Sequence, residues 1–264
     1  MLRLKSTWRR NLTLGASALL SAEALRRNIF LHELEVGIPL GWLSAASILV
    51  PTLVRNCEWF GPVHSQFPAR GRQVWLTIDD GPDPLDTPEM LDVLARHESL
   101  ATFFSIGKKI VRWPFLTEAA CRAGHSVQCH TFSHPAKSFW AALPRRADRE
   151  IQEGIAAVHA STGMWPTQLR VPAGLGNVFV HKAAEKLGLA MVGWSASGLD
   201  GIAHVPERVV ERILSTLRPG CIILLHEGPL FGLRPGTRAK TLEAVLKGLK
   251  ERGYETVIPQ LVHA

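Results

Sequence analysis

Two adjacent carboxylates end an apolar run in the stretch LTIDDGPDP. Residues 74–79 read as a buried strand, and Asp79 and Asp80 follow each other at its tip. Two like charges this close are unfavourable unless a positive group lies on them. Taken alone, the pair would also suit a turn with a helix cap. If it does chemistry, it predicts a cation nearby, either a metal ion or a basic side chain.

A second motif, QCHTFSHP, offers metal ligands. His130 and His134 are four residues apart, which lets two imidazoles on a turn or helical segment bind one ion. With Asp80 they make two imidazoles and a carboxylate, the ligand set of catalytic zinc sites that keep an open position. Other divalent first-row ions suit the same donors. We expect a metal ion on one Asp of the pair and Arg170 near the other.

Polar side chains end or occupy four of the apolar runs. They are Asp79 and Asp80 in the first run, His130 in the third, Arg170 in the fourth and His226 in the sixth. In parallel α/β folds the carboxyl ends of the strands carry the active site. These side chains are therefore expected to meet at one rim.

The elements that must position them alternate along the chain from Gln73 onward. Apolar runs that read as strands lie at 74–79, 101–107, 125–130, 168–172, 190–196, 221–226 and 255–259. Amphipathic segments that read as helices begin at Thr87-Pro88-Glu89 and continue at 114–123, 144–161, 178–187, 206–217 and 237–252. Repeated strand-then-helix units predict a parallel sheet. The expected class is α/β, an incomplete barrel of about seven strands, with an open doubly wound sheet as the alternative.

The charge of the chain is concentrated at its N-terminus. The net charge of the 264 residues is +7, and residues 1–27 hold six Lys or Arg against one acid, Glu23, a net +5. A nucleic-acid-binding protein needs its basic surface on the folded domain. The charge distribution therefore gives no reason to expect nucleic acid as a partner. Apolar residues make up 46% of the chain, which is enough for a substantial core.

Residues 36–54 form a run of nineteen residues without a charge. A helix of this length can just cross the apolar core of a bilayer, where Pro and Gly are tolerated. The basic residues before it predict an N-terminus inside and an extracytoplasmic remainder, on the periplasmic side or at the cell surface. The alternatives are a buried core helix with a basic arm, and a signal peptide cleaved near Ala22-Glu23-Ala24. The expected division is a basic segment (1–35), a transmembrane helix (36–54), a linker (55–72) and a catalytic domain (73–264).

The motifs LTIDDGPDP, CHTFSHP, LRVPAG and IILLHEG, in this order and spacing, resemble those of the polysaccharide deacetylases, the NodB homology domain of carbohydrate esterase family four. ATFFSIG on the expected second strand strengthens the resemblance, which covers about residues 73–262. The resemblance implies a distorted (β/α) barrel and metal-dependent removal of N-acyl groups from amino sugars. It implies Zn²⁺ first, with Co²⁺, Ni²⁺ or Mn²⁺ as alternatives.

The resemblance also implies catalytic roles. Asp79 matches the general base, His226 the general acid, and Arg170 the arginine that orients and tunes the base. These roles agree with the chemistry, because a bound divalent ion acidifies water, a neighbouring carboxylate can take its proton, and histidine titrates in the range needed to protonate an amine.

Further matches concern the metal and the substrate. Leu224 matches an apolar wall around the acyl methyl, and the backbone N–H of Ala173 matches a donor to the oxyanion. Trp140, in the loop after the two histidines, is a candidate for stacking on a sugar ring. The implied metal ligands are Asp80, His130 and His134.

The chain departs from the family pattern in two motifs. Ala173 replaces a frequent Tyr after R-x-P. In WSASGLDG, Asp200 matches the second acid of a family motif, whereas Ser197 and Gly201 lie where another acid and a Trp are usual. Asp200 is expected to support Arg170, and the missing Trp predicts a substrate surface unlike that of typical chitin or peptidoglycan enzymes.

Three functions remain open at this point. The first is the metal-dependent removal of N-acetyl or other N-acyl groups from a polysaccharide or glycoconjugate by a membrane-anchored enzyme. The second keeps the chemistry but acts on a lipid-linked amino sugar, as a deacylase or deformylase, because an anchor places the site near such a lipid. The third is a catalytically degenerate barrel that only binds a glycan or a partner, supported by the altered motif around Asp200.

Overall fold

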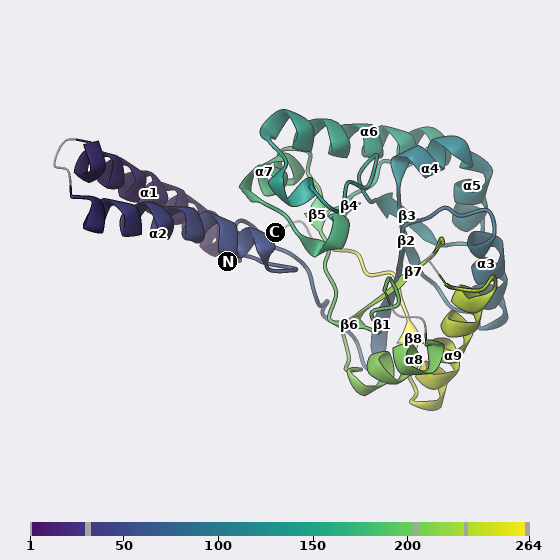
Figure 1. Ribbon diagram of the computed structural model, residues 1–264. Helices are drawn as coiled ribbons and strands as arrows, with labels where there is room; N and C mark the ends of the chain where they lie inside the picture. Colours follow the sequence, from purple (N-terminus) through teal and green to yellow (C-terminus); the bar gives the residue numbers. More distant parts are fainter. Residues whose placement is uncertain (1, 30–32, 203–204, 230–231, 262–264) are drawn as a thin grey trace.

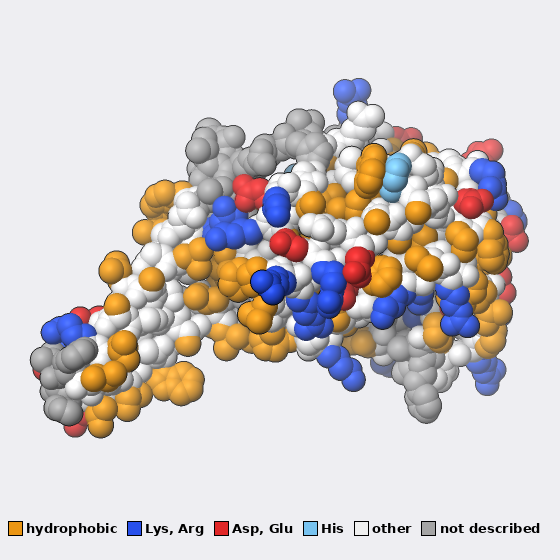
Figure 2. Space-filling view, turned by 90° about the horizontal axis from the view of Figure 1, so that it is seen from above, with side chains coloured by type: hydrophobic (Ala, Val, Ile, Leu, Met, Phe, Trp, Pro, Cys, Tyr) orange, Lys and Arg blue, Asp and Glu red, His pale blue; other side chains and the backbone are white. Residues whose placement is uncertain are grey.

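The computed structural model describes residues 2–29, 33–202, 205–229 and 232–261, and it has two parts (Figure 1). The larger part is a parallel sheet covered by helices. The smaller part is a hairpin of two long helices, α1 (Leu2–Ile29) and α2 (Leu34–Leu53), that projects from it. Hydrophobic side chains gather along the projecting hairpin (Figure 2). The helices are antiparallel, so the start of α1 and the end of α2 both lie at the base, beside the α/β domain.

Seven parallel strands form one curled sheet in the order β5-β4-β3-β2-β1-β7-β6, and an eighth strand, β8, pairs with β1. Their bounds are β1 (Gln73–Asp79), β2 (Thr102–Ser105), β3 (Ser126–Cys129), β4 (Gln168–Leu169), β5 (Ala190–Met191), β6 (Ala196–Ser197), β7 (Ile222–His226) and β8 (Glu255–Thr256). This confirms the α/β class and the distorted barrel. The strand order does not have the reversal at its centre that marks a doubly wound sheet.

The run at 190–196, expected as one strand, forms two strands at opposite ends of the sheet order. β5 pairs with β4, whereas β6 pairs with β7. Only residues 192–195 connect β5 to β6, and so short a connection requires the two outer strands to lie close together. The sheet therefore curls into a barrel with a gap between its first and last strands.

Residues 64–67 lie across this gap. The backbone of His64 makes two hydrogen bonds to residues at the end of β5, of 2.8 and 2.9 Å, and the N–H of Phe67 donates to the turn before β7 at 2.9 Å. Phe60 and Phe67 are buried. This part of segment 55–72, for which the sequence predicts a linker, thus packs as part of the folded domain.

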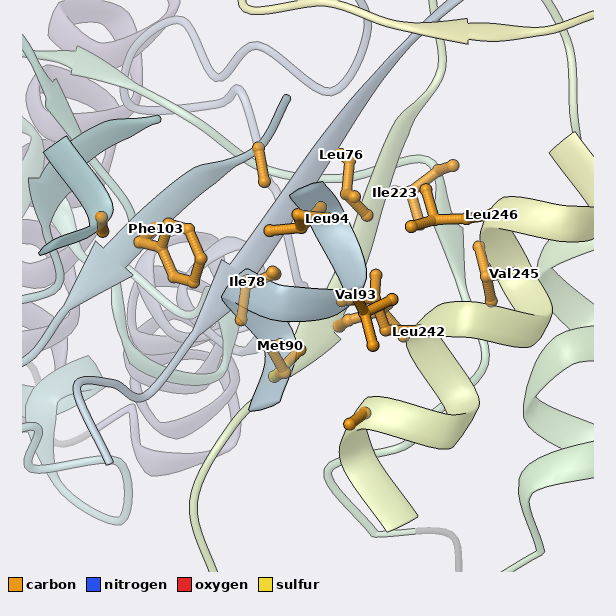
Figure 3. Packing of buried hydrophobic residues seen from close by; sticks show 14 of the residues in the cluster. Leu76, Ile78, Met90, Val93, Leu94, Phe103, Ile223, Leu242, Val245 and Leu246 are labelled. Atoms are coloured by element: carbon orange, nitrogen blue, oxygen red, sulfur yellow. The ribbon is translucent and has the colours of Figure 1, made fainter. Parts of the chain in front are cut away.

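Helices cover the outer face of the sheet and enclose the main core (Figures 1 and 3). They are α3 (Asp86–Arg96), α4 (Gly107–Arg112), α5 (Pro114–Arg122), α6 (Pro144–Thr162), α7 (Val178–Lys186), α8 (Pro206–Ser215) and α9 (Thr237–Glu251), with short 3₁₀ turns η1 (Phe139–Ala141) and η2 (Pro172–Gly174).

The central strand β1 shows how the core positions the site. Leu76 and Ile78 point into the core against α3 and α9, and both are fully buried (Figure 3). Burying such a side chain contributes about 1.5–3 kcal/mol. Since strand residues alternate between faces, Thr77 and Asp79 point to the opposite, inner face. The apolar positions of β1 therefore set the direction of its carboxylate.

Candidate active site

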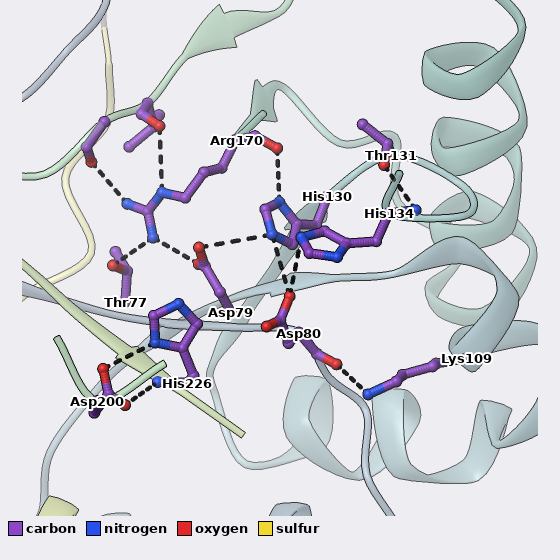
Figure 4. Close-up of polar contacts among 12 residues, drawn as sticks. Thr77, Asp79, Asp80, Lys109, His130, Thr131, His134, Arg170, Asp200 and His226 are labelled. Carbon is purple, nitrogen blue, oxygen red and sulfur yellow. Dashed lines mark hydrogen bonds and ion pairs between the residues drawn. The ribbon is translucent and has the colours of Figure 1, made fainter. Parts of the chain in front are cut away.

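Strand register brings the expected site residues to one rim (Figure 4). In the pairing of β1 with β7, Asp79 lies opposite His226 and Thr77 lies opposite Leu224. His130 follows the last residue of β3, and Arg170 follows the last residue of β4. The carboxyl ends of four parallel strands thus deliver a carboxylate, two imidazoles and a guanidinium to the same place, as the sequence predicts.

Arg170 is the most completely enclosed charge of the site. Its side chain is 0% exposed, and its guanidinium donates to Asp79 Oδ1 and Thr77 Oγ1, both at 2.7 Å. It also donates to the backbone carbonyls of residues 192 and 193, at 3.2 and 2.8 Å. The guanidinium carbon lies 4.2 Å from the centre of the Phe104 ring. Burial lowers the pKa of Arg170, although the Asp79 carboxylate opposes the shift.

The second carboxylate meets the two histidines. Asp80 Oδ1 lies 3.4 Å from His130 Nε2 and 3.2 Å from His134 Nε2, and the three candidate ligand atoms all lie within 4.8 Å of one another. His130 Nδ1 is 2.7 Å from the carbonyl oxygen of Arg170. A hydrogen bond there places the proton on Nδ1, so that Nε2 keeps its lone pair for a ligand bond.

The electrostatics of this group fit a divalent cation. Asp80 Oδ1 is buried and accepts no hydrogen bond within the described part of the chain. Burial alone raises the pKa of Asp80, but His130 and His134 lower it far below the usual value, so the carboxylate is ionised. Burial, and after it the neighbouring His130, lowers the pKa of His134 to about 4, so the imidazole of His134 is neutral at pH 7. Burial alone lowers the pKa of His130, but Asp79 and Asp80 outweigh it and raise that pKa, so a bound cation would take the place of a proton on His130. An ionised carboxylate beside a neutral imidazole is what a metal ligand set requires.

Unusual backbone conformations are concentrated around the site. Asp80, Thr131, His134, Ala173 and Leu199 have φ between 51° and 74°, although none is glycine. Such conformations are uncommon for side-chain-bearing residues and persist where the surrounding structure enforces them. The surrounding structure therefore holds the loops that carry the candidate ligands and Ala173 in backbone conformations that are locally unfavourable.

Asp200 binds His226 and not Arg170, the partner that the sequence predicts for it. Asp200 Oδ1 is 2.8 Å from His226 Nδ1, and Asp200 Oδ2 accepts the backbone N–H of His226 at 2.7 Å. Arg238 of α9 donates to Asp200 Oδ2 at 3.1 Å. The expectation that Asp200 supports Arg170 is wrong, because the Asp200 carboxylate binds His226 and Arg238, whereas the carboxylate that binds Arg170 is that of Asp79. No local pattern in the sequence points to Arg238.

The Asp200 carboxylate should control the protonation of His226. Burial alone lowers the pKa of His226, but Asp200 outweighs it and raises the pKa to about 9. The charged imidazolium, able to give up a proton, is then lost only as pH rises through that value. In Asp200→Asn the opposing charge is gone, and we expect the alkaline fall of kcat/KM to move to lower pH by about 1–3 units. Full pH–rate profiles of the two proteins measure this shift.

The matched control for that profile is Asp92→Asn, which neutralises an exposed acid of α3. Its alkaline limb should coincide with that of the unchanged protein. An unshifted limb in Asp200→Asn would show that another group governs the alkaline side.

The site opens into a cavity of about 260 Å³. Ala173 and Leu224, both expected near the substrate, lie in its wall. Trp140 does not line it, and the indole N–H of Trp140 donates to the Lys137 carbonyl at 3.0 Å. Trp194 lines the cavity instead, although its sequence position suggests core. Further lining residues that sequence reasoning did not assign to substrate are Arg55, Ala136, Val171, Leu199 and Ile202.

Ser197 and Gly201, the positions that depart from the motif, also line the cavity. A Cβ atom at Gly201 would lie 3.1 Å from His226 Cε1, so even a small side chain would crowd the imidazole in this backbone conformation. Glycine at 201 therefore keeps space beside His226 where a Trp is usual.

Known proteins are similar to this chain in sequence and in fold. A family model described as Polysaccharide deacetylase matches residues 67–192. The chain is 35% identical over 191 residues to a chitooligosaccharide deacetylase of Bradyrhizobium sp. (strain ANU 289), with 72% of this chain and 84% of that one covered. It is 33% identical to the peptidoglycan-N-acetylglucosamine deacetylase PgdA of Listeria monocytogenes (strain 10403S), over 70% of this chain and 38% of that one. The structure of a family 4 carbohydrate esterase from Streptomyces lividans in complex with acetate matches with a TM-score of 0.64 at 26% identity, over 72% and 94% of the two chains.

Proposed function

Because the chain belongs to the polysaccharide deacetylase family, we propose that it removes N-acetyl groups from amino sugars of a polysaccharide or glycoconjugate. The observation that carries the proposal is the meeting of Asp79 with the Asp80, His130 and His134 group in one cavity. The curated relatives are named for chitooligosaccharide and for peptidoglycan N-acetylglucosamine, which supports an N-acetylated glycan as substrate.

Asp80, His130 and His134 would hold a divalent ion, which we propose to be Zn²⁺. Such an ion would acidify water and polarise the amide carbonyl. Asp79 would act as the base: Arg170 binds its Oδ1, while its Oδ2 lies 3.7 Å from His130 Nε2 and so faces the ligand group. The arginine thereby orients the carboxylate toward the proton that it removes.

The other groups act on the amide. His226, charged through its pairing with Asp200, would protonate the departing amine. The backbone N–H of Ala173 would donate to the developing oxyanion, a role for which its enforced backbone conformation suits it. Leu224 lies two residues before His226 on the same face of β7 and would pack against the acyl methyl.

The first test is the metal content of the full chain in detergent, measured by mass spectrometry after equilibration with Zn²⁺. We expect about one ion per chain, and His130→Ala should lose it because that variant removes one of three protein ligands. Chelation should abolish acetate release from an N-acetylated oligosaccharide, and added Zn²⁺ or Co²⁺ should restore it.

His159→Ala is the matched control, because His159 lies on α6 and stacks on Trp165, outside the cavity. It should keep both the ion and the activity. Equal metal content in His130→Ala and in unchanged protein would contradict the ligand assignment, and a metal-loaded protein that releases no acetate from any N-acetylated glycan would contradict the function.

A second substrate class, a lipid-linked amino sugar, is favoured by one observation. Arg55, directly after the apolar helix α2, lines the cavity with an exposed side chain. Two exposed apolar residues, Leu199 (37%) and Ile202 (70%), lie in the same wall. A cation and apolar side chains at one cavity suit a substrate that joins an amino sugar to a lipid through a phosphate.

Arg55→Gln should therefore change the preference between substrates. We expect the ratio of kcat/KM for a polyprenyl-phosphate-linked N-acetylglucosamine to kcat/KM for a neutral chitooligosaccharide to fall by at least about tenfold, since a charge-assisted hydrogen bond is worth about 1.5–3 kcal/mol. Arg122→Gln, at an exposed ion pair of α5, is the control. An unchanged ratio in Arg55→Gln would remove the support for the lipid-linked class.

We also propose that the N-terminal segment anchors the enzyme to a membrane. The helix Leu34–Leu53 is long and apolar enough to cross one, and 17% of its most apolar window is buried. The extracytoplasmic location of the catalytic domain stays a prediction of the sequence. The altered motif is the support for a catalytically degenerate barrel, and the meeting of Asp79, His226 and the three candidate ligands in one cavity argues against it.

A further inference from the structure

The helices α1 and α2 are joined to each other by polar contacts in the middle of the hairpin. Ser44 of α2 is 4% exposed. Its hydroxyl lies 2.8 Å from that of Ser17 and 2.7 Å from that of Ser21, and it donates to the Ser17 carbonyl at 2.8 Å. Small residues with hydroxyl contacts between helices are typical of helix pairs in membranes, where close backbone approach and polar contacts hold the pair.

The outward faces of the same helices are apolar. Along α1, Leu12, Leu19 and Leu25 are 55–74% exposed. On α2, Trp42 is 74% exposed, and Ile38, Leu43, Leu49 and Val50 are 45–58% exposed. Polar groups turned inward and large apolar groups turned outward reverse the pattern of a soluble helical hairpin. Such a helix pair is stable where an apolar environment surrounds most of it.

Charged residues of the hairpin lie toward its two ends. At the tip, Glu23 binds both Arg26 and Arg27, and Arg27 also binds Glu33. At the base, Arg10 donates to Glu185 of α7 at 2.9 Å, which ties α1 to the catalytic domain. Between these ends, residues 11–22 of α1 and residues 36–54 of α2 carry no charge. The uncharged middle of one helix thus lies beside that of the other.

We infer that α1 and α2 enter the lipid bilayer together as a hairpin, so that the N-terminus and the catalytic domain lie on the same side of the membrane. The nineteen uncharged residues of α2 span about 28 Å, close to the apolar thickness of a bilayer. The twelve of α1 span about 18 Å. The rest of the bilayer thickness would face the last turns of α1, where the long side chains of Arg26 and Arg27 can reach the far surface. Their ion pairs with Glu23 reduce the charge that enters the apolar layer.

The lipid bilayer fits this surface better than a second copy of the chain does. A partner hairpin would cover one side of the pair, whereas exposed apolar side chains lie on both helices over most of their length. The contact of Arg10 with Glu185 also holds the base of α1 against the catalytic domain. α1 therefore cannot stay on the opposite side of the membrane from that domain without breaking both this contact and the serine contacts.

This topology differs from the single crossing that the sequence predicts. With one crossing, the N-terminus and the catalytic domain are on opposite sides. With a hairpin, five Lys or Arg lie in the chain at or before the base (Arg3, Lys5, Arg9, Arg10 and Arg55) and two lie at the tip (Arg26 and Arg27). Basic residues favour the cytoplasmic side, so this distribution favours a cytoplasmic base and, with it, a cytoplasmic catalytic domain, in place of the extracytoplasmic location that a single crossing predicts.

Epitope tags placed on the full chain test the inference. One tag is added at the N-terminus, one at the C-terminus and one, in a separate protein, between Ile29 and Glu33. Protease accessibility of each tag is measured in right-side-out and in inverted membrane vesicles. We expect the two terminal tags to be digested in the same vesicles and the tip tag in the opposite ones, whichever compartment the base occupies.

Any of three results would overturn the inference. Terminal tags digested in opposite vesicles would establish a single crossing, and a protein released from membranes by alkaline carbonate, or a dimer that forms without lipid, would assign the apolar surface to another occupant. Ser44→Leu, which removes the serine contacts, should yield a mixture of orientations of the N-terminal tag, whereas Ser47→Leu, at a partly buried position whose hydroxyl bonds only within α2, should not. The readout does not depend on activity, so it stands apart from the proposed function.

Discussion

Replacing Asp79 by Asn should lower kcat/KM for an N-acetylated oligosaccharide by about 10²- to 10⁴-fold, the usual contribution of a positioned general base. The amide has nearly the same shape as the carboxylate, and its oxygen can still accept the hydrogen bond that Arg170 gives to Oδ1. It cannot accept a proton at neutral pH. The barrel and the neighbouring ligand group should therefore persist while the chemical step fails.

Two measurements separate this loss from a damaged site. The metal content of Asp79→Asn should stay near one ion per chain, since the three candidate ligands are unchanged. Asp92→Asn, which makes the same chemical change on the exposed surface of α3, should keep full activity. An Asp79→Asn protein that retained a third or more of kcat/KM would mean that another group takes the proton.

Replacing Arg170 by Met should destabilise the fold by about 3–5 kcal/mol, the usual cost of removing one partner from a buried ion pair. The change leaves Asp79, which is 3% exposed, without its guanidinium, and it leaves the carbonyls of residues 192 and 193 without their donor. These carbonyls belong to the short connection between β5 and β6, so the loss also loosens the closure of the barrel. Equilibrium unfolding in urea, followed by tryptophan fluorescence, measures the change.

The double variant Asp79→Asn/Arg170→Met distinguishes a charge effect from a packing effect. If the unpaired Asp79 carboxylate causes most of the loss of stability, neutralising it should recover part of that stability, and the effects of the two changes on the free energy of unfolding should be non-additive by about 1 kcal/mol or more. Arg122→Met, at an exposed pair of α5, should alter stability by no more than about 0.5 kcal/mol. A loss of stability in Arg170→Met as small as that in Arg122→Met would show that the buried hydrogen bonds of Arg170 do not stabilise the fold.

Much of the site could be predicted because its residues stand at the ends of apolar runs that are recognisable as strands. An apolar run that ends in Asp79 or His226 specifies both a buried strand and a polar group at its tip, and parallel pairing then brings the tips together. Thr77 could have been found in the same way, since it alternates with Asp79 and shares its face. The sequence also predicts Arg170 near one Asp of the pair, and the resemblance to the deacetylases implies that this is Asp79.

Other parts depend on contacts between distant segments, which leave no local pattern. Arg238 reaches Asp200 from α9, thirty-eight residues away. The run at 190–196 is mostly apolar, and its Gly193 and Ser195 do not by themselves show that the chain passes there from one edge of the sheet to the other. Trp140 stands in the loop after the two histidines and Trp194 in an apolar run, and only the tertiary path of the chain decides that Trp194 lines the cavity.

The backbone contacts of residues 64–67 have a consequence for the solubility of shortened forms of the protein. A fragment that began at residue 73 would leave β5 and the turn before β7 without these partners, and unpaired strand edges recruit other chains into aggregates. A fragment that began near Arg55 would keep the edges protected, because His64 and Phe67 would still bridge them. Proteolytic release of the enzyme from its hairpin should accordingly yield a soluble product only when cleavage falls before this bridging segment.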